Sequence, residues 1–422
     1  MKFRHLVLLG TGLGLSPLPH PAGAQSLEEV TAIALEHSPA IAGADARAQA
    51  AAAQLDFAKA QTLPDLNAQG QIGFGRIDPK GFFGLTADDT NPLTAQVTAE
   101  MPLLTFGRTG GGIDAARGGA QAAELMARQA RLNLRVEVAA AYAEAVSARR
   151  LLGSYDLLRF SLAEVLRQSE LKFKVGATTS TDLAQAKARL AEADAGHAAA
   201  DGRLKAAMAA LRSLTGLDTV ALDDALPAPP PIPATRDEAM AMALAGNPQL
   251  LAAGKAVEAA EGNERMTKGE ALPMLGAYAE AAAVRDQFFP GYKADSYSAG
   301  LRVKWNFFSS GRNGAKARAA GSETDAAQAD YDMARLRTEQ AAITAYDGYE
   351  TARLMLAAAD ARQTAAKEAL RGTKLEVEAG AKPQLALLDA QREAIEAEAA
   401  LSSAQGRLIA SAYQLRAVAG ME

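Results

Sequence analysis

The chain has 422 residues and a formal net charge of −5, with 49% hydrophobic but only 5% aromatic side chains. It contains no cysteine, which excludes disulfides, thiol chemistry and a lipid-modified N-terminal cysteine. The acidic balance and the lack of a basic run interleaved with aromatics give no support to nucleic-acid binding. Four scattered histidines show no metal-ligand spacing, so we expect no metal and no other cofactor.

The N-terminal segment has the pattern of a secretory signal peptide. Lys2 and Arg4 precede the short apolar run Leu6–Leu15, and small residues at 22–24 suit cleavage. We therefore expect residues 1–24 to be removed on export. No later stretch approaches 18 consecutive apolar residues, so a part of the chain that spans a membrane would have to be built from β-strands.

The rest of the chain consists of two tandem repeats of one sequence pattern. Gly176 and Gly107-Arg108 recur 204 positions later as Gly380 and Gly311-Arg312. Such self-similarity is the signature of a repeat architecture. We expect a first repeat over residues 25–225 and a second over 235–422. Between them, residues 226–234 form a proline-rich, extended linker.

Each repeat is predicted to open with helices. Ser26 and Thr235 are each followed three residues later by Glu, which is the pattern of a capping box. Ser38-Pro39 and Asn247-Pro248 then restart a helix with proline at its first position, where the missing N–H is harmless.

The hydrophobic period next changes from 3.6 to 2. Alternating segments predict strands at about 65–76 and 94–104, a weaker strand at about 274–284, and another at about 296–308. Strands of about ten residues with one apolar and one polar face have the length needed to cross a bilayer at a tilt. An ordinary half-exposed hairpin would show the same alternation.

Long helices follow the strands. From Gly107 to Gly176 there is no proline, so one helix there could be about 100 Å long. A Gly-centred turn and a return helix of about 50 Å come next, and the second repeat copies the pattern. The expected turns lie at about 175–183 and 379–387.

Four strands per chain cannot close a barrel, and an open sheet edge is not tolerated in lipid. If the strands span the membrane, several chains must share one barrel. Eight strands enclose only side chains, so three chains contributing twelve strands are the smallest odd-numbered solution with a lumen.

The duplicated helix–strand–loop–strand–long helix–turn–helix order resembles the TolC family of outer-membrane efflux proteins over essentially the whole mature chain. The Asn247-Pro248 restart, the Gly-Arg pairs that end the strand hairpins and the two Gly-centred turns carry the resemblance. It implies a mainly α fold with a small transmembrane β-barrel contribution and two tandem repeats. The long hairpins would form a trimeric α-barrel in the periplasm, with four strands per chain in a shared 12-stranded barrel in the outer membrane.

The same resemblance implies a passive channel-tunnel of a tripartite efflux or type I secretion system, without enzymatic activity. Its expected partners are two further copies of the chain, outer-membrane lipid, a periplasmic adaptor (membrane fusion) protein and an inner-membrane transporter of RND, ABC or MFS type. The main alternative is a periplasmic coiled-coil adaptor or scaffold without a pore. An enzyme is the weakest alternative, because no nucleophile–base pair or metal cluster is visible.

By resemblance, the two turns are the periplasmic tips, where the duct is gated and the adaptor docks. The gate candidates are Asp182, Asp389 and Lys382. The adaptor-contact candidates are Val175, Gly176, Thr178, Leu183, Ala379, Gly380 and Leu387. A ring of carboxylates from three chains would constrict a pore and attract cations. Simpler roles compete with gating: a carboxylate at position 182 favours the helix dipole, and one at 389 could be a solvated surface group.

Overall fold

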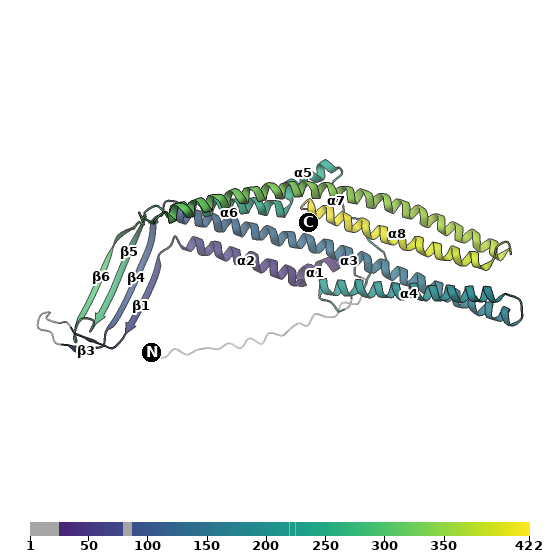
Figure 1. Cartoon of the computed structure of the whole chain (residues 1–422), viewed down its shortest axis with the longest axis horizontal. Coiled ribbons are helices and arrows are strands. Elements are labelled where there is room, and N and C mark those ends of the chain that lie inside the picture. The colour runs from purple at the N-terminus through teal and green to yellow at the C-terminus, as the bar shows by residue number, and fades with distance from the viewer. Residues whose placement is uncertain (1–24, 79–86, 219, 224) are drawn as a thin grey trace, which may run out of the picture. The chain divides into compact units, whose positions relative to one another are not determined.

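The computed structural model describes residues 25–78, 87–218, 220–223 and 225–422, so the expected signal peptide lies outside the described residues. Its helices are α1 (Leu27–His37), α2 (Pro39–Ala60), α3 (Arg108–Lys174), α4 (Ser180–Thr215), α5 (Arg236–Gly246), α6 (Pro248–Gly269), α7 (Arg312–Glu378) and α8 (Gln384–Val418). Its strands are β1 (Asp65–Ile72), β2 (Gly75–Ile77), β3 (Asp88–Thr90), β4 (Leu93–Leu104), β5 (Met274–Arg285) and β6 (Lys293–Lys304) (Figure 1).

The element order confirms the predicted duplication. In both halves a short helix and a second helix lead into strands, and a helix of 67 residues then precedes a return helix of 36 or 35 residues. Residues 226–233 of the expected linker form neither helix nor strand. None of the helices in the described ranges is both long enough and apolar enough to cross a membrane.

Side-chain caps explain where the first helix of each repeat begins. Ser26 and Glu29 form the reciprocal capping box that the sequence predicts, with each side chain accepting from the other residue's backbone N–H. The second box is only half formed. Thr235 accepts from the backbone of Glu238 at 3.1 Å, but the Glu238 carboxylate accepts from Ala234 rather than from the N-cap residue.

The backbone contacts divide the chain into two compact units, and each contains segments of both repeats. The tip unit consists of residues 25–34, Val138–Ala228 and Ala358–Arg407. The sheet unit consists of Leu35–Glu137, Pro229–Ala357 and Leu408–Glu422. Neither repeat is therefore a compact unit by itself.

The main sheet has the antiparallel order β1-β4-β5-β6. Its central pair, β4 and β5, joins the first repeat to the second (Figure 1). One row of paired residues across the sheet consists of Ala68, Val97, Ala281 and Tyr297. All four occupy the apolar positions of the alternating pattern. Because neighbouring residues point to opposite faces, one face is apolar and the other carries the polar residues.

The observed strands refine the expected boundaries. The first predicted segment divides into β1 and the short β2, which pairs with β3 in a separate two-stranded sheet. The weakly predicted segment is the 12-residue β5, which lies between β4 and β6. β6 begins at Lys293 and ends at Lys304, so the aromatic residues Trp305, Phe307 and Phe308 lie beyond it. There the backbone leads into a turn with positive φ at Ser310 and Gly311.

Glycines allow α3 and α6 to pack almost backbone to backbone within the sheet unit. A Cβ added to Gly262 would lie 2.4 Å from the backbone nitrogen of Ala115, and one added to Gly118 would lie 2.7 Å from the carbonyl oxygen of Lys255. Real Cβ atoms do not approach backbone so closely. This part of the α3–α6 contact therefore depends on residues without side chains.

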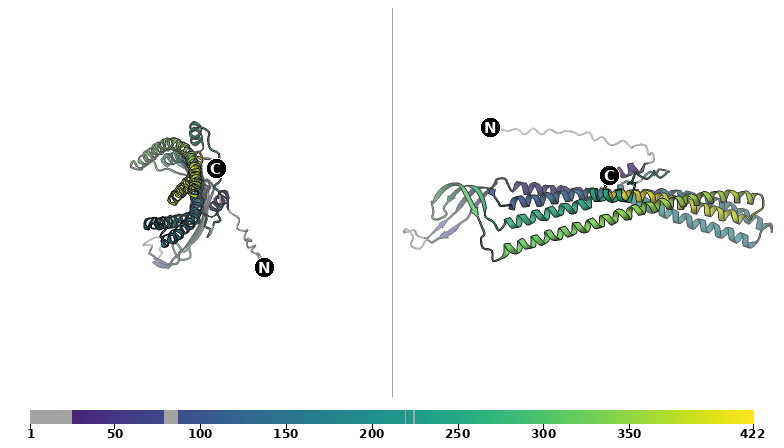
Figure 2. Two further views of the ribbon diagram at one scale, coloured as in Figure 1. Left: turned by 90° about the vertical axis from the view of Figure 1, so that its right-hand side faces the viewer. Right: turned by 90° about the horizontal axis from the view of Figure 1, so that it is seen from above.

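The tip unit has its own small apolar core and a polar anchor. Leu158 and Leu162 of α3, Ala193 of α4 and Leu388 of α8 form a buried cluster, and α4 and α8 are the return helices drawn in teal and yellow in Figure 2. The buried Tyr142 hydroxyl donates to the carbonyl of Gln25 at 2.8 Å and accepts from the amide of Asp223 at 3.1 Å. Burial raises the pKa of Tyr142, so its hydroxyl stays protonated and able to donate.

Candidate functional site

Both long helices end in the same glycine turn. Gly176 and Gly380 have φ values of +70° and +74°, which a residue with a side chain rarely adopts. In the first turn the amide of Ala177 donates to the carbonyl of Lys172, and in the second the amide of Ala381 donates to that of Glu376, each at 2.8 Å. These bonds across the αL glycine are those of a Schellman motif.

The predicted adaptor-contact residues lie on these turns and in the first turns of the return helices. Val175 is strongly exposed, with 78% of its surface accessible. Gly176, Ala379 and Gly380 are also exposed, whereas Thr178, Leu183 and Leu387 are partly buried. Apart from the two glycines, whose conformation the turns require, nothing in the fold explains why these exposed positions hold the residues they do.

The Asp182 side chain caps the N-terminus of α4. Its Oδ2 accepts hydrogen bonds from the hydroxyls of Thr179 at 2.8 Å and Thr178 at 2.9 Å, and from the Thr179 amide at 3.2 Å. The Thr179 hydroxyl in turn caps the Asp182 amide, which completes a capping box. The hydrogen bonds from Thr179 and Thr178 lower the pKa of Asp182. Asp182 also lies in the first turn of α4, where a carboxylate favours the helix dipole, and the cap adds a second structural role that the sequence reasoning did not consider.

This cap makes the start of α4 sensitive to acid. Because the folded-state pKa of Asp182 is lowered, its stabilising effect is complete above the unfolded-state pKa and is lost as the pH falls through the folded-state value. We expect hydrogen exchange in the first turn of α4, corrected for intrinsic rates, to accelerate at acid pH in the wild type. In Asp182→Asn the same turn should exchange faster at neutral pH and show little further dependence on pH.

The control for this measurement is Asp201→Asn. Asp201 also lies on α4 and pairs with Lys205 at 2.7 Å, far from the capped turn. Its replacement should leave exchange in the first turn of α4 unchanged. An identical pH dependence of that turn in Asp182→Asn and the wild type would contradict the assignment of the cap.

Asp389 lies in an ion-pair cluster between α4 and α8. Its Oδ1 is 2.8 Å from Nη2 of Arg189, which also binds Glu192 at 2.9 Å through Nη1. Glu192 is in turn 3.4 Å from Arg392 on α8. These four residues, the tip quartet, lie beside the apolar cluster of the tip unit and are roughly one third to one half exposed. The hydrogen bond from Arg189 lowers the pKa of Glu192, so its carboxylate stays ionised near neutral pH.

Sequence reasoning identified Asp389 but missed its three partners. A signal for them exists. The return helices carry opposite charges three positions apart in reversed order, Arg189 then Glu192 on α4 and Asp389 then Arg392 on α8. Two helices lying side by side with such complementary order can form two cross-pairs. Recognising the signal requires knowing that α4 and α8 are neighbours.

Lys382 is engaged within its own turn, where its ammonium is 2.7 Å from the carboxylate of Glu376. In the described residues, no hydrogen bond or ion pair joins Asp182, Asp389 and Lys382 to one another. The same ranges contain no group of three or more side chains that could hold a metal ion. The tips therefore offer fixed charges, hydrogen-bonded turns and exposed small residues.

The fold is that of outer-membrane channels. It is similar to the CmeC outer membrane channel of Campylobacter jejuni, with a TM-score of 0.81 and 18% identity over 93% of this chain and 85% of that one. It is also similar to a membrane protein from Pseudomonas aeruginosa, with a TM-score of 0.80 and 24% identity over 94% of this chain and 90% of that one.

Sequence comparison identifies the family. The family model described as outer membrane efflux protein matches residues 30–217 and 239–421, and the chain belongs to that family. The chain is 29% identical to the outer membrane efflux protein BepC of Brucella suis over 288 residues, which are 67% of this chain and 62% of BepC. It is 24% identical to the outer membrane protein TolC of Vibrio cholerae over 427 residues, which cover 99% of this chain and 95% of TolC.

Family membership places the protein in the outer membrane and in the class of outer membrane efflux proteins. The relatives named for this family are outer-membrane channels and efflux proteins, and the alternative of a scaffold without a pore is not favoured.

Proposed function

We propose that three copies of this chain form one outer-membrane duct that carries cargo passively from the periplasm to the exterior. The observation that carries the proposal is the four-stranded sheet, whose edge strands β1 and β6 have no partner strand on their outer sides among the described residues. An unpaired backbone edge is not tolerated in lipid. Twelve strands from three copies would satisfy every edge and leave a lumen.

Engineered disulfides across the proposed seams test this closure. The chain has no native cysteine, so Asn67→Cys on β1 can be combined in turn with Ser296→Cys, Ser298→Cys or Gly300→Cys on β6. Within one chain β1 and β6 are separated by two strands, about 14 Å, which is too far for a disulfide. We expect at least one combination to give covalent dimers and trimers on oxidation.

Each single-cysteine variant is the control and should remain monomeric on a denaturing gel. If oxidation yields no covalent oligomer for any combination in outer membranes, the shared barrel is wrong.

In this duct the two glycine turns are the docking surface. A periplasmic adaptor would bind the exposed surface around Val175 and Ala379, and the adaptor would link the duct to an inner-membrane transporter of RND, ABC or MFS type. Photo-cross-linking from Val175 in intact cells should then trap a periplasmic protein. Leu354 on α7 in the sheet unit, which is 64% exposed, is the matched position that should not trap it. Equal adducts from both positions would contradict docking at the turns.

We place the gate at the tip quartet rather than at Asp182 alone. The ion pairs Arg189–Asp389 and Arg392–Glu192 join α4 of one hairpin to α8 of the other, so their loss should let the hairpins separate. Two half-exposed pairs at about 0.5 kcal/mol each change an equilibrium about fivefold. We therefore expect the Glu192→Gln, Asp389→Asn double variant to raise open-state occupancy in planar bilayers by about fivefold.

Asp194→Asn is the control for the gate. The Asp194 carboxylate is 2.6 Å from Arg159, with an exposure similar to that of the quartet, but this pair joins the two helices of a single hairpin. Its loss should leave open-state occupancy unchanged. A gate elsewhere would be indicated if both variants behaved like the wild type.

A further inference from the structure

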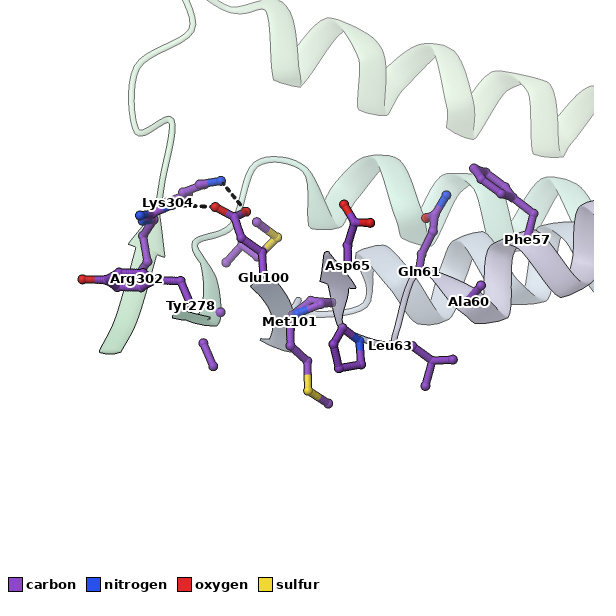
Figure 3. Close-up of a pocket in the computed structure, with 15 residues that line it drawn as sticks. Phe57, Ala60, Gln61, Leu63, Asp65, Glu100, Met101, Tyr278, Arg302 and Lys304 are labelled. Carbon is purple, nitrogen blue, oxygen red and sulfur yellow. Dashed lines mark hydrogen bonds and ion pairs between the residues drawn. The ribbon is translucent and has the colours of Figure 1, made fainter. Parts of the chain in front are cut away.

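A cavity of about 610 Å³ lies in the sheet unit where α2 passes into β1. Its wall contains the polar and charged residues Gln61, Asp65, Glu100, Tyr278, Arg302 and Lys304. Figure 3 shows Arg302 and Lys304 converging on Glu100, with Asp65 on the same side and the side chain of Met101 directed to the other. The cavity therefore gathers charged groups from β1, β4 and β6 at one end of the sheet.

The charges in this cavity are unequally paired. Nη1 of Arg302 is 2.6 Å from the Glu100 carboxylate, and its guanidinium lies 4.3 Å from the centre of the Tyr278 ring. Lys304 shares the same carboxylate at the longer distance of 3.4 Å. The Glu100 carboxylate is therefore shared by Arg302 and Lys304, and Arg302 makes the closer contact. A positive charge in excess remains on β6, at one edge of the sheet.

The opposite edge carries the complementary charge. Asp65, the first residue of β1, accepts a hydrogen bond from its neighbour Asn67 at 2.8 Å and, in the described residues, has no ion pair. It lies opposite Glu100 in the register, and strand alternation places Lys304 on that same polar face. Asp65 begins one edge strand and Lys304 ends the other, at the same end of the sheet.

We propose that Lys304 of one copy forms an ion pair with Asp65 of the next, at each seam where β6 meets β1. The inference rests on the proposed trimer and adds to it the residues that recognise the neighbouring copy. A head-to-tail contact of this kind joins two different surfaces, so complementary charges at the two edges favour it and like charges would oppose it. Long side chains reach directly opposite or diagonal partners across antiparallel strands.

Charge reversal tests the pair. Asp65→Lys and Lys304→Asp each place like charges at every seam, whereas the double variant restores attraction with the signs exchanged. From typical values for exposed ion pairs, repeated at three seams, we expect each single variant to lower the trimer–monomer equilibrium constant about tenfold. The double variant should recover most of that loss. The deficits should shrink in 1 M salt, where screening acts within about 3 Å.

Lys293→Asp provides the matched control. Lys293 lies on the same strand but at its other end and on the other face, so this change should not rescue Asp65→Lys. A wild-type protein that is not a trimer would overturn the proposed duct. A wild-type trimer in which the double variant is no better than the singles, or in which Lys293→Asp rescues equally well, would overturn the ion pair alone.

Discussion

Gly262→Ala is expected to destabilise the protein by about 3 kcal/mol, at the upper end of the usual cost of overpacking. The added Cβ would lie 2.4 Å from the nitrogen and 2.9 Å from the Cα of Ala115, and 2.9 Å from the carbonyl oxygen of Gly111. All three are backbone atoms of α3, so no side chain can rotate away. To relieve this clash, α6 would have to move away from α3.

The same substitution at Gly119 is the matched control and should have the opposite sign. Gly119 also lies in α3, but a Cβ there meets nothing within 4 Å. Replacing glycine by alanine in an open helical position stabilises by about 0.5–1 kcal/mol. Thermal unfolding followed by helical circular dichroism, at one scan rate, compares the two. A Gly262→Ala variant as stable as Gly119→Ala would contradict the close α3–α6 contact.

The second large effect is expected from Val97→Arg. Val97 lies near the middle of β4, is 49% exposed, and belongs to the apolar row that includes Ala281 and Tyr297. If this face meets lipid, an arginine near the bilayer midplane costs about 2–4 kcal/mol. We therefore expect strongly reduced insertion of Val97→Arg into lipid vesicles and a small yield of protein in outer membranes.

Thr98→Arg tests the assignment of the faces. Thr98 is the next residue along β4 and points to the polar face, which would line the lumen. It should insert as well as the wild type, because water in a lumen solvates the arginine. If Val97→Arg and Thr98→Arg lost membrane insertion equally, one face of the sheet would not meet lipid while the other meets water. That result would contradict the assignment of the two faces.

Much of the fold could be predicted because its signals are local. Glycine at 176 and 380 marks the ends of two proline-free helical runs, and the Ser26 capping box marks the first helix start. The order of strands in the sheet could not be predicted. Four alternating segments of similar length do not specify which pairs with which, so the contact of β4 with β5 across the two repeats appears only in the structure.

The candidate site shows the same limit. Asp182 is held by its neighbours Thr178 and Thr179, and its place in the first turn of a helix, where a carboxylate favours the dipole, was considered from sequence. The capping box that it forms appears only in the structure. Asp389 is placed by Arg189, 200 positions away, and only the packing of α4 against α8 brings them together. The predicted extension of the last strand to 308 failed because aromatic alternation continues past Lys304, while the backbone leaves the sheet there.

We infer that three chains share one barrel in the outer membrane. Native mass spectrometry of the protein, extracted from outer membranes in mild detergent, tests it most directly. We predict a homotrimer whose subunits lack residues 1–24. A monomer or dimer recovered from the soluble periplasm would contradict the duct and favour a scaffold.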